Sequence, residues 1–209
     1  MEKSGVKKWV QCSTAVQSTT FDEATQKFTV RTRNVDTSVE KSEEFDYCIC
    51  CSGHFSTPNV PAFPGFEAFA GRTLHAHDFR SAEEFEGKNV MIVGSSYSAE
   101  DIASQCYKYG VKSVTCSYRT NALGFHWPDN FKTVPLLDHI DPGTKTCHFI
   151  NGEKADIDAI ILCTGYQHYF PFVEPALRLK TANRLWCDSL HEGVVLHDNN
   201  KMMYIGMQD

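Results

Sequence analysis

The fold class is decided by the stretch Lys88-Asn89-Val90-Met91-Ile92-Val93-Gly94-Ser95-Ser96-Tyr97-Ser98-Ala99-Glu100-Asp101. Its apolar run ends at Gly94, and a helical pattern follows at once. This order is typical of a dinucleotide-binding βα turn, in which the helix N-terminus meets a pyrophosphate. The usual G-x-G-x-x-G reads Gly94-x-Ser96-x-x-Ala99 here, and Ala99 still permits close helix–strand packing. On this motif alone, an ordinary βα turn without a ligand stays open as an alternative.

The end of the next predicted strand, Val111 to Tyr118, indicates which dinucleotide is bound. An NAD site normally has an acidic residue there, about 20 residues past the glycine turn. This chain has Arg119 and Thr120 instead, and a guanidinium suits a 2′-phosphate. The alternative is an arginine that merely occupies a surface turn. The prediction is an NADP(H) site made of Gly94, Ser95, Ser96, Tyr97, Ser98, Ala99, Arg119 and Thr120.

Composition excludes several functional classes. The 209 residues carry a net charge of −6, which argues against a nucleic-acid partner. No apolar run approaches the roughly 20 residues of a membrane span, and no signal peptide opens the chain. The odd total of nine cysteines suits a reducing compartment, so we expect a cytoplasmic protein. His75 and His77 lack a second ligand pair at zinc spacing, so no metal site is predicted.

The chain is predicted to have three parts. The first, residues 1–65, contains β-strands and a proline-rich linker, and residues 66–170 form the nucleotide-binding domain. Residues 171–209 are then expected to return into the domain of the first part, and that domain is expected to be truncated. The expected strands and helix are Val6–Val16, Lys27–Arg33, Glu44–Ser52, Val90–Val93, Ser98–Tyr109, Cys147–Ile150, Ile157–Cys163 and Tyr204–Met207, with a hairpin loop over residues 34–43.

A third motif, Phe69-x-Gly71-x-x-x-His75-x-x-x-Phe79, precedes the nucleotide strand, and Leu162-Cys163-Thr164-Gly165-Tyr166 follows later. Together with the glycine turn, these segments resemble the flavin-containing monooxygenases. Within that family, the segments Ser104–Gly110, Tyr118–Thr120 and Tyr204–Asp209 are most similar to the bacterial trimethylamine monooxygenase branch.

The resemblance implies an enzyme that uses FAD, NADPH and O₂. In that family NADPH reduces FAD, a flavin C4a-hydroperoxide forms, and a soft amine or sulfide, such as trimethylamine, attacks its distal oxygen. A homodimer would be usual. The implied roles are NADP(H) binding by the glycine turn and by Arg119 and Thr120, and a place near the reacting centre for Tyr97. His75 and Phe79 would act at the domain junction and not in proton transfer, and Phe69 and Gly71 belong to the same family motif. Thr164 and Gly165 would bring the backbone close to a cofactor, and Gln208 would contact FAD.

The chain departs from the family at its N-terminus. No strand–G-x-G-x-x-G–helix for the FAD pyrophosphate precedes Val6, so we expect a fragment of a longer enzyme. The predicted fold class is α/β, with a Rossmann-like NADP(H)-binding domain and the β-rich part of a truncated FAD-binding domain. Two functions follow: part of an N- or S-oxygenating monooxygenase, or a non-catalytic NADP(H)-binding module.

Overall fold

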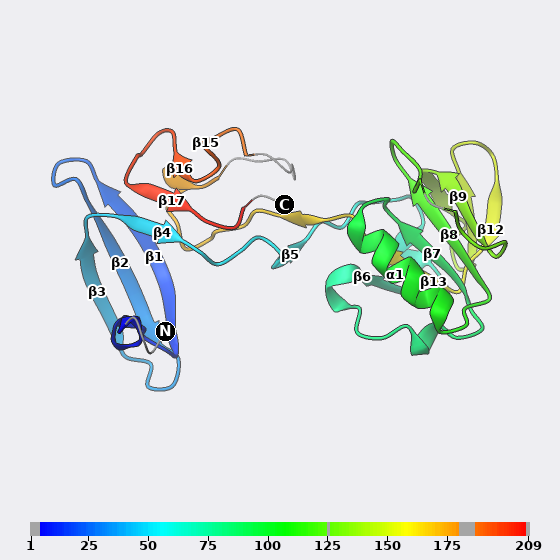
Figure 1. Cartoon of the computed structure of the whole chain (residues 1–209), viewed down its shortest axis with the longest axis horizontal. Coiled ribbons are helices and arrows are strands. Elements are labelled where there is room, and N and C mark those ends of the chain that lie inside the picture. The colour runs from blue at the N-terminus through cyan, green and yellow to red at the C-terminus, as the bar shows by residue number, and fades with distance from the viewer. Residues whose placement is uncertain (1–4, 125, 180–186, 208–209) are drawn as a thin grey trace. The chain divides into compact units, whose positions relative to one another are not determined.

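The structure, a computed structural model, describes residues 5–124, 126–179 and 187–207. The chain divides into two compact units, residues 1–57 with 167–209, and residues 58–166 (Figure 1). Each unit has a hydrophobic core of its own. In the described part of the chain, no helix is both long and apolar enough to cross a membrane.

Residues 58–166 are built on a five-stranded parallel sheet of order β6-β13-β7-β8-β9. Its strands are β6 (Arg72–His75), β7 (Asn89–Val93), β8 (Ser113–Tyr118), β9 (Phe131–Pro135) and β13 (Ala159–Leu162). Helix α1 (Tyr97–Lys108) connects β7 to β8. The sheet order from β9 to β7 is that of one Rossmann half, so the expected α/β fold class is confirmed.

The two faces of this sheet are covered by different layers. Val90 and Ile92 of β7 pack with Ile102 of α1, whereas Met91 and Val93 pack on the opposite side. That second layer is an antiparallel meander of β10 (Leu137–Ile140), β11 (Thr146–Phe149) and β12 (Lys154–Asp156). Because layers cover both faces of the parallel sheet, the strand residues on each face are apolar, as is usual for parallel sheets.

The other unit is rich in antiparallel strands. One sheet contains β1 (Thr14–Asp22), β2 (Lys27–Asn34) and β3 (Glu40–Phe45). The other has the order β15-β16-β17-β4, with β15 (Leu190–His191), β16 (Val195–Leu196), β17 (Met202–Tyr204) and β4 (Cys48–Cys50). This unit also contains the short 3₁₀ helices η1 (Val6–Trp9) and η5 (Pro175–Leu177). The 3₁₀ helices η2 (Phe66–Ala68), η3 (Ala76–Asp78) and η4 (Glu83–Phe85) lie in residues 58–166. The short strands β5 (Thr57–Pro58) and β14 (Tyr166–Gln167) pair with each other.

Several expected boundaries are corrected. The first predicted strand is wrong at its start, where Val6–Trp9 forms a 3₁₀ helix with no buried residue. The hairpin loop is shorter than expected, because β3 begins at Glu40. All six residues of β3 are exposed, so hydrophobic alternation could not have revealed this strand. Helix α1 agrees with its prediction to within one residue at each end.

All nine cysteines are free. Cys48 and Cys51 have C-x-x-C spacing, but they lie across the end of a strand and not at a helix N-terminus. Burial raises the pKa of the Cys48 thiol and raises that of Cys50 to about 12. A reactive thiol normally has a lowered pKa, so the raised pKa values of Cys48 and Cys50 argue against a redox-active dithiol that contains either of them.

Candidate functional site

The turn between β7 and α1 is closely packed against the next strand of the sheet. Gly94 has a φ of +127°, and its N–H donates to the Ser117 carbonyl of β8 at 2.8 Å. On its other side, an added Cβ would lie 2.2 Å from the Cys163 carbonyl oxygen. Only glycine avoids this collision while it adopts the required backbone angle.

The first turn of α1 presents its backbone N–H groups outward. Ser96 is the N-cap residue, and its side chain makes no capping hydrogen bond. The N–H groups of Ala99 and Glu100 donate to the Ser96 carbonyl, whereas helix geometry leaves Tyr97 and Ser98 without an intrahelical acceptor. The Tyr97 side chain is 80% exposed, and Ala99 is fully buried. This helix start can therefore accept an anion through its backbone and its dipole.

Arg119 and Thr120 follow directly after β8, at the same edge of the sheet as the glycine turn. The β7–β8 register pairs Val93 with Ser117, so the segments that follow β7 and β8 leave the sheet side by side. Arg119 and Thr120 are exposed. Within the described ranges, the Arg119 guanidinium makes no hydrogen bond or ion pair, and it is available to an anionic ligand.

A second turn leaves the same edge from β13, and its polar groups are engaged within the protein. The Gly165 carbonyl accepts from the Asn59 N–H at 2.9 Å and from Nε2 of His75 at 3.0 Å. The Thr164 hydroxyl donates to the Asn59 carbonyl, and the Asn59 amide donates to the Thr164 carbonyl at 3.2 Å. These contacts tie the end of β13 to the proline-rich linker and to β6.

The protonation state of His75 follows from its partners. The His77 N–H donates to Nδ1 of His75 at 3.0 Å, so Nδ1 carries no proton and Nε2 donates to Gly165. Burial of this side chain, which is 5% exposed, lowers the pKa of His75. The imidazole is a neutral group that holds the turn, packed edge-on against the Tyr166 ring at 5.1 Å.

The other members of the first family motif pack within the same unit. A Cβ on Gly71 would lie 2.5 Å from the Phe69 ring and from the Asp158 carbonyl oxygen, so this position requires glycine. Phe79 stacks on Phe85, with their ring centroids 6.2 Å apart. The structure therefore engages Phe69, Gly71 and Phe79 in packing and His75 in hydrogen bonding.

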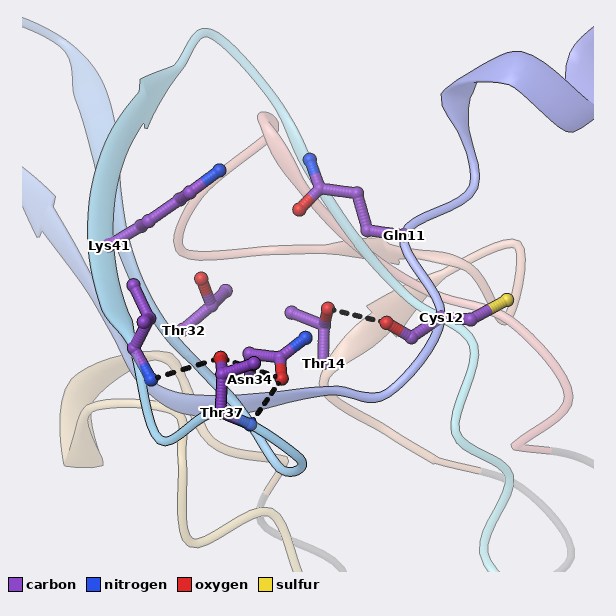
Figure 2. Close-up of a pocket in the computed structure, with 8 residues that line it drawn as sticks. Gln11, Cys12, Thr14, Thr32, Asn34, Thr37 and Lys41 are labelled. Carbon is purple, nitrogen blue, oxygen red and sulfur yellow. Dashed lines mark hydrogen bonds between the residues drawn. The ribbon is translucent and has the colours of Figure 1, made fainter.

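A cavity of about 410 Å³ lies elsewhere, on the β1–β3 sheet, and is lined by Gln11, Cys12, Thr14, Thr32, Asn34, Thr37, Val39 and Lys41 (Figure 2). The Asn34 side chain accepts hydrogen bonds from the Asp36 N–H, the Thr37 N–H and the Thr37 hydroxyl. These bonds build the β2–β3 hairpin turn, and none of the residues predicted to form a site lines this cavity.

The sequence analysis missed Asn59, and one residue that it predicted lies outside the part of the chain that the structure describes. Asn59 stands in the linker, 105 residues from Thr164, and no local pattern marks its contact. Gln208, expected to contact FAD, lies outside the described residues.

Comparisons with known proteins agree on one family. A family model described as flavin-binding monooxygenase-like matches residues 1–124. The trimethylamine monooxygenase of Methylocella silvestris is 57% identical over 209 residues, which are all of this chain and 46% of that relative. The senecionine N-oxygenase of Tyria jacobaeae is 29% identical over 87% of this chain and 40% of its own length. The chain thus spans about half the length of the curated relatives that it matches.

Solved structures agree with the sequence relatives. The crystal structure of Tmm from Pelagibacter sp. strain HTCC7211 has a TM-score of 0.86 and 49% identity, covering 94% of this chain and 44% of that one. The S-allyl-L-cysteine S-oxygenase of Allium sativum has a TM-score of 0.82 and 26% identity, covering 98% of this chain and 47% of that one.

Proposed function

This chain belongs to the flavin-binding monooxygenase-like family, and we propose that it supplies the NADP(H)-binding part of an NADPH- and FAD-dependent monooxygenase. The chain spans 46% of its trimethylamine monooxygenase relative, so the activity is proposed for the enzyme to which it contributes. Residues 58–166 are proposed as the NADP(H)-binding domain.

The observation that carries the proposal is the open end of the sheet at β7 and β8. The first turn of α1 offers backbone N–H groups at its dipole-positive end, where a pyrophosphate binds in Rossmann folds. At the end of the neighbouring strand, Arg119 offers a cation that has no partner among the described residues. The described residues therefore fit a dinucleotide with a 2′-phosphate, which a guanidinium can bind through two hydrogen bonds.

The FAD part of the proposal rests on family membership. Among the described residues α1 is the only α-helix, so they offer no second helix N-terminus for a flavin pyrophosphate. When bound in the enzyme, FAD would activate oxygen with a hydride that NADPH provides. For this chain's own residues, Ser95–Ala99 bind and orient the nucleotide, and exposed Tyr97 is proposed to lie near the reacting centre.

The neutral His75 is proposed to position the β13 turn and not to transfer protons. Both of its ring nitrogens are used within the protein, one by Gly165 and the other by the His77 N–H. This arrangement holds the Thr164–Gly165 backbone at the edge of the sheet where the nucleotide would bind. A rigid edge keeps the two cofactors aligned, which hydride transfer requires.

The proposed substrate is a soft nitrogen or sulfur nucleophile, with trimethylamine as the first to test. Relatives at 57% to 47% identity are named trimethylamine monooxygenases, and more distant relatives are named for N- or S-oxygenation. A homodimer stays a prediction from the family.

The nucleotide assignment is tested by calorimetric titration of the parent and Arg119→Ala with NADPH and NADH. The variant should lose about 1.5–3 kcal/mol of NADPH binding, because a charged hydrogen bond is removed, and NADH binding should change little. Arg31→Ala, which removes an exposed arginine of β2, is the matched control. Equal NADPH affinity in the parent and Arg119→Ala would remove the 2′-phosphate assignment.

The described residues contain a single α-helix N-terminus, and this favours a second candidate, a non-catalytic NADP(H)-binding module. Purification with excess FAD, followed by a visible absorption spectrum, separates the two. A retained flavin band, with NADPH-driven oxygen uptake that trimethylamine stimulates, supports the monooxygenase. A folded, colourless protein that still binds NADPH supports the binding module.

A further inference from the structure

A cluster of possible metal ligands lies on the β10–β11 hairpin, and we propose that His139, Asp141 and His148 form a binding site for a divalent transition-metal ion of the zinc class. One ligand atom from each residue lies within 4.8 Å of the other two. The proposal does not depend on the monooxygenase function, because none of these residues belongs to the nucleotide site.

Strand geometry brings the three side chains to one face of the meander. His139 of β10 and His148 of β11 are direct partners in the register, and their rings stack with centroids 4.1 Å apart. Asp141 follows His139 by two residues, which is the spacing of neighbours on one face of a strand. Ile140 and Cys147, between these positions, are fully buried in the core beneath.

A β-bulge creates the pairing of the two histidines. Leu137 pairs with Phe149 and His139 pairs with His148, so Asp138 is the extra residue of β10. Without this bulge, His148 would face Asp138, and His139 would face Cys147. Bulges are known to re-aim side chains beside functional sites.

The hydrogen bonds prepare suitable ligand atoms. Nδ1 of His139 donates to the Asp138 carboxylate at 2.8 Å, so its Nε2 is left with a lone pair for a metal. A carboxylate bonded to the far nitrogen of a ligating histidine is the usual outer-shell arrangement of metal sites. Nε2–H of His148 donates to an Asp141 carboxylate oxygen at 3.0 Å, and a bound ion would take the place of this proton, which would be released to solvent. Two ligands of a tetrahedral ion at about 2.0 Å would lie about 3.3 Å apart, so little movement is needed.

The ligand set selects the class of ion. Two imidazoles with one carboxylate suit Zn²⁺, Ni²⁺ or Cu²⁺, whereas Mg²⁺ and Ca²⁺ prefer oxygen ligands alone. Three protein ligands leave one position of a tetrahedral zinc ion open to water or to a small ligand. Lys154 lies opposite His148 in the β11–β12 register, and its positive charge opposes the binding of a cation there.

The test is calorimetric titration of the 209-residue chain with ZnCl₂ at neutral pH. One ion should bind per chain, and His139→Asn or His148→Gln should weaken binding by more than about tenfold. Asp138→Ala should weaken it by about tenfold through loss of the outer-shell carboxylate. Lys154→Met should bind several-fold more tightly, an effect that a loss of folding cannot imitate.

His77→Asn is the matched control. His77 also bonds an adjacent carboxylate, Asp78, at 2.8 Å and has the same 40% side-chain exposure as His139. Among the described residues, however, it belongs to no three-ligand cluster. Co²⁺ serves as a second probe, because thiolate ligands produce strong near-ultraviolet charge-transfer bands and nitrogen and oxygen ligands do not. Absence of binding, binding unchanged in both histidine variants, or a thiolate spectrum overturns the proposal.

Discussion

Two turns leave the same edge of the parallel sheet, and they use their polar groups in opposite ways. After β7, the first turn of α1 leaves N–H groups without an intrahelical acceptor, and the Ser96 side chain caps nothing. After β13, Thr164 and Gly165 are bonded to Asn59 and His75. The difference separates a helix start whose backbone N–H groups are open from a turn whose polar groups are already bonded within the protein. The substitutions below test this contrast, starting with the position where the two turns touch.

Gly94→Ala should have the largest effect, because it affects both turns at once. The added Cβ would lie 2.2 Å from the Cys163 carbonyl, which is backbone and cannot rotate away. We expect a loss of more than about 3 kcal/mol in the free energy of unfolding, measured by urea denaturation. The control is Gly152→Ala, where φ is +85° but no atom lies within 4 Å of the Cβ. There the strain alone should cost about 1–2 kcal/mol. Similar losses in the two variants would contradict the close approach at Gly94.

His75→Leu should have the next largest effect, because it removes the support of the closed turn. The His77 N–H would lose its acceptor, and the Gly165 carbonyl would keep only the Asn59 N–H. The expected loss of unfolding free energy is about 1–3 kcal/mol, which is the usual cost of an unsatisfied buried group. His77→Asn, at an exposed side chain, should stay within about 0.5 kcal/mol of the parent. A neutral His75→Leu would mean that Asn59 alone holds the turn.

The same histidine predicts a pH dependence. Burial lowers the pKa of His75 below its ordinary value, so the unfolded chain takes up the proton first as pH falls. The stability that neutral His75 contributes is therefore complete above about pH 6.5 and is lost as pH falls through the lowered pKa. The stability difference between the parent and His75→Leu should shrink on acidification, in urea titrations at about pH 8 and about pH 5. A stability difference between the parent and His75→Leu that grows on acidification would contradict a neutral His75.

Ser96→Ala should have the smallest effect, because the open turn does not use this side chain. Loss of a capping serine usually costs about 1 kcal/mol. The Ser96 side chain is exposed and makes no capping bond, so the change in unfolding free energy should stay below about 0.5 kcal/mol. Denaturation of the variant beside Gly94→Ala gives the comparison directly. A loss as large as that of a usual N-cap would show that the hydroxyl caps α1 in solution.

The two turns also differ in how far they could be predicted. Gly94, the start of α1 and the end of β8 all lie within about one βαβ unit, where hydrophobic periodicity and turn residues are informative. The predicted bounds of α1 therefore agree with the structure to within one residue at each end. Strand β3 was missed in part because its residues are all exposed and carry no apolar alternation.

Contacts between distant segments were beyond the sequence. The motif identified His75 and Gly165 as important, but their hydrogen bond joins residues 90 positions apart. Asn59 was not singled out, because only the folded chain places the linker beside the end of β13. The spacing of histidines predicted no metal site, since the His139–His148 pair depends on a bulge that shifts the register by one residue.

By itself, the sequence determined the α/β class and the family to which the chain belongs, and it led to the predictions of an NADP(H)-type turn and of Arg119 as the residue that binds the 2′-phosphate. These follow from local patterns of side chains, which are written in consecutive residues. Only the tertiary structure decided that one sheet edge carries an open turn and a closed turn, and that His75 is neutral. The reason is physical: hydrogen-bond partners and burial depend on strand register and packing between segments far apart in the chain, and these together decide which groups remain free to bind a ligand.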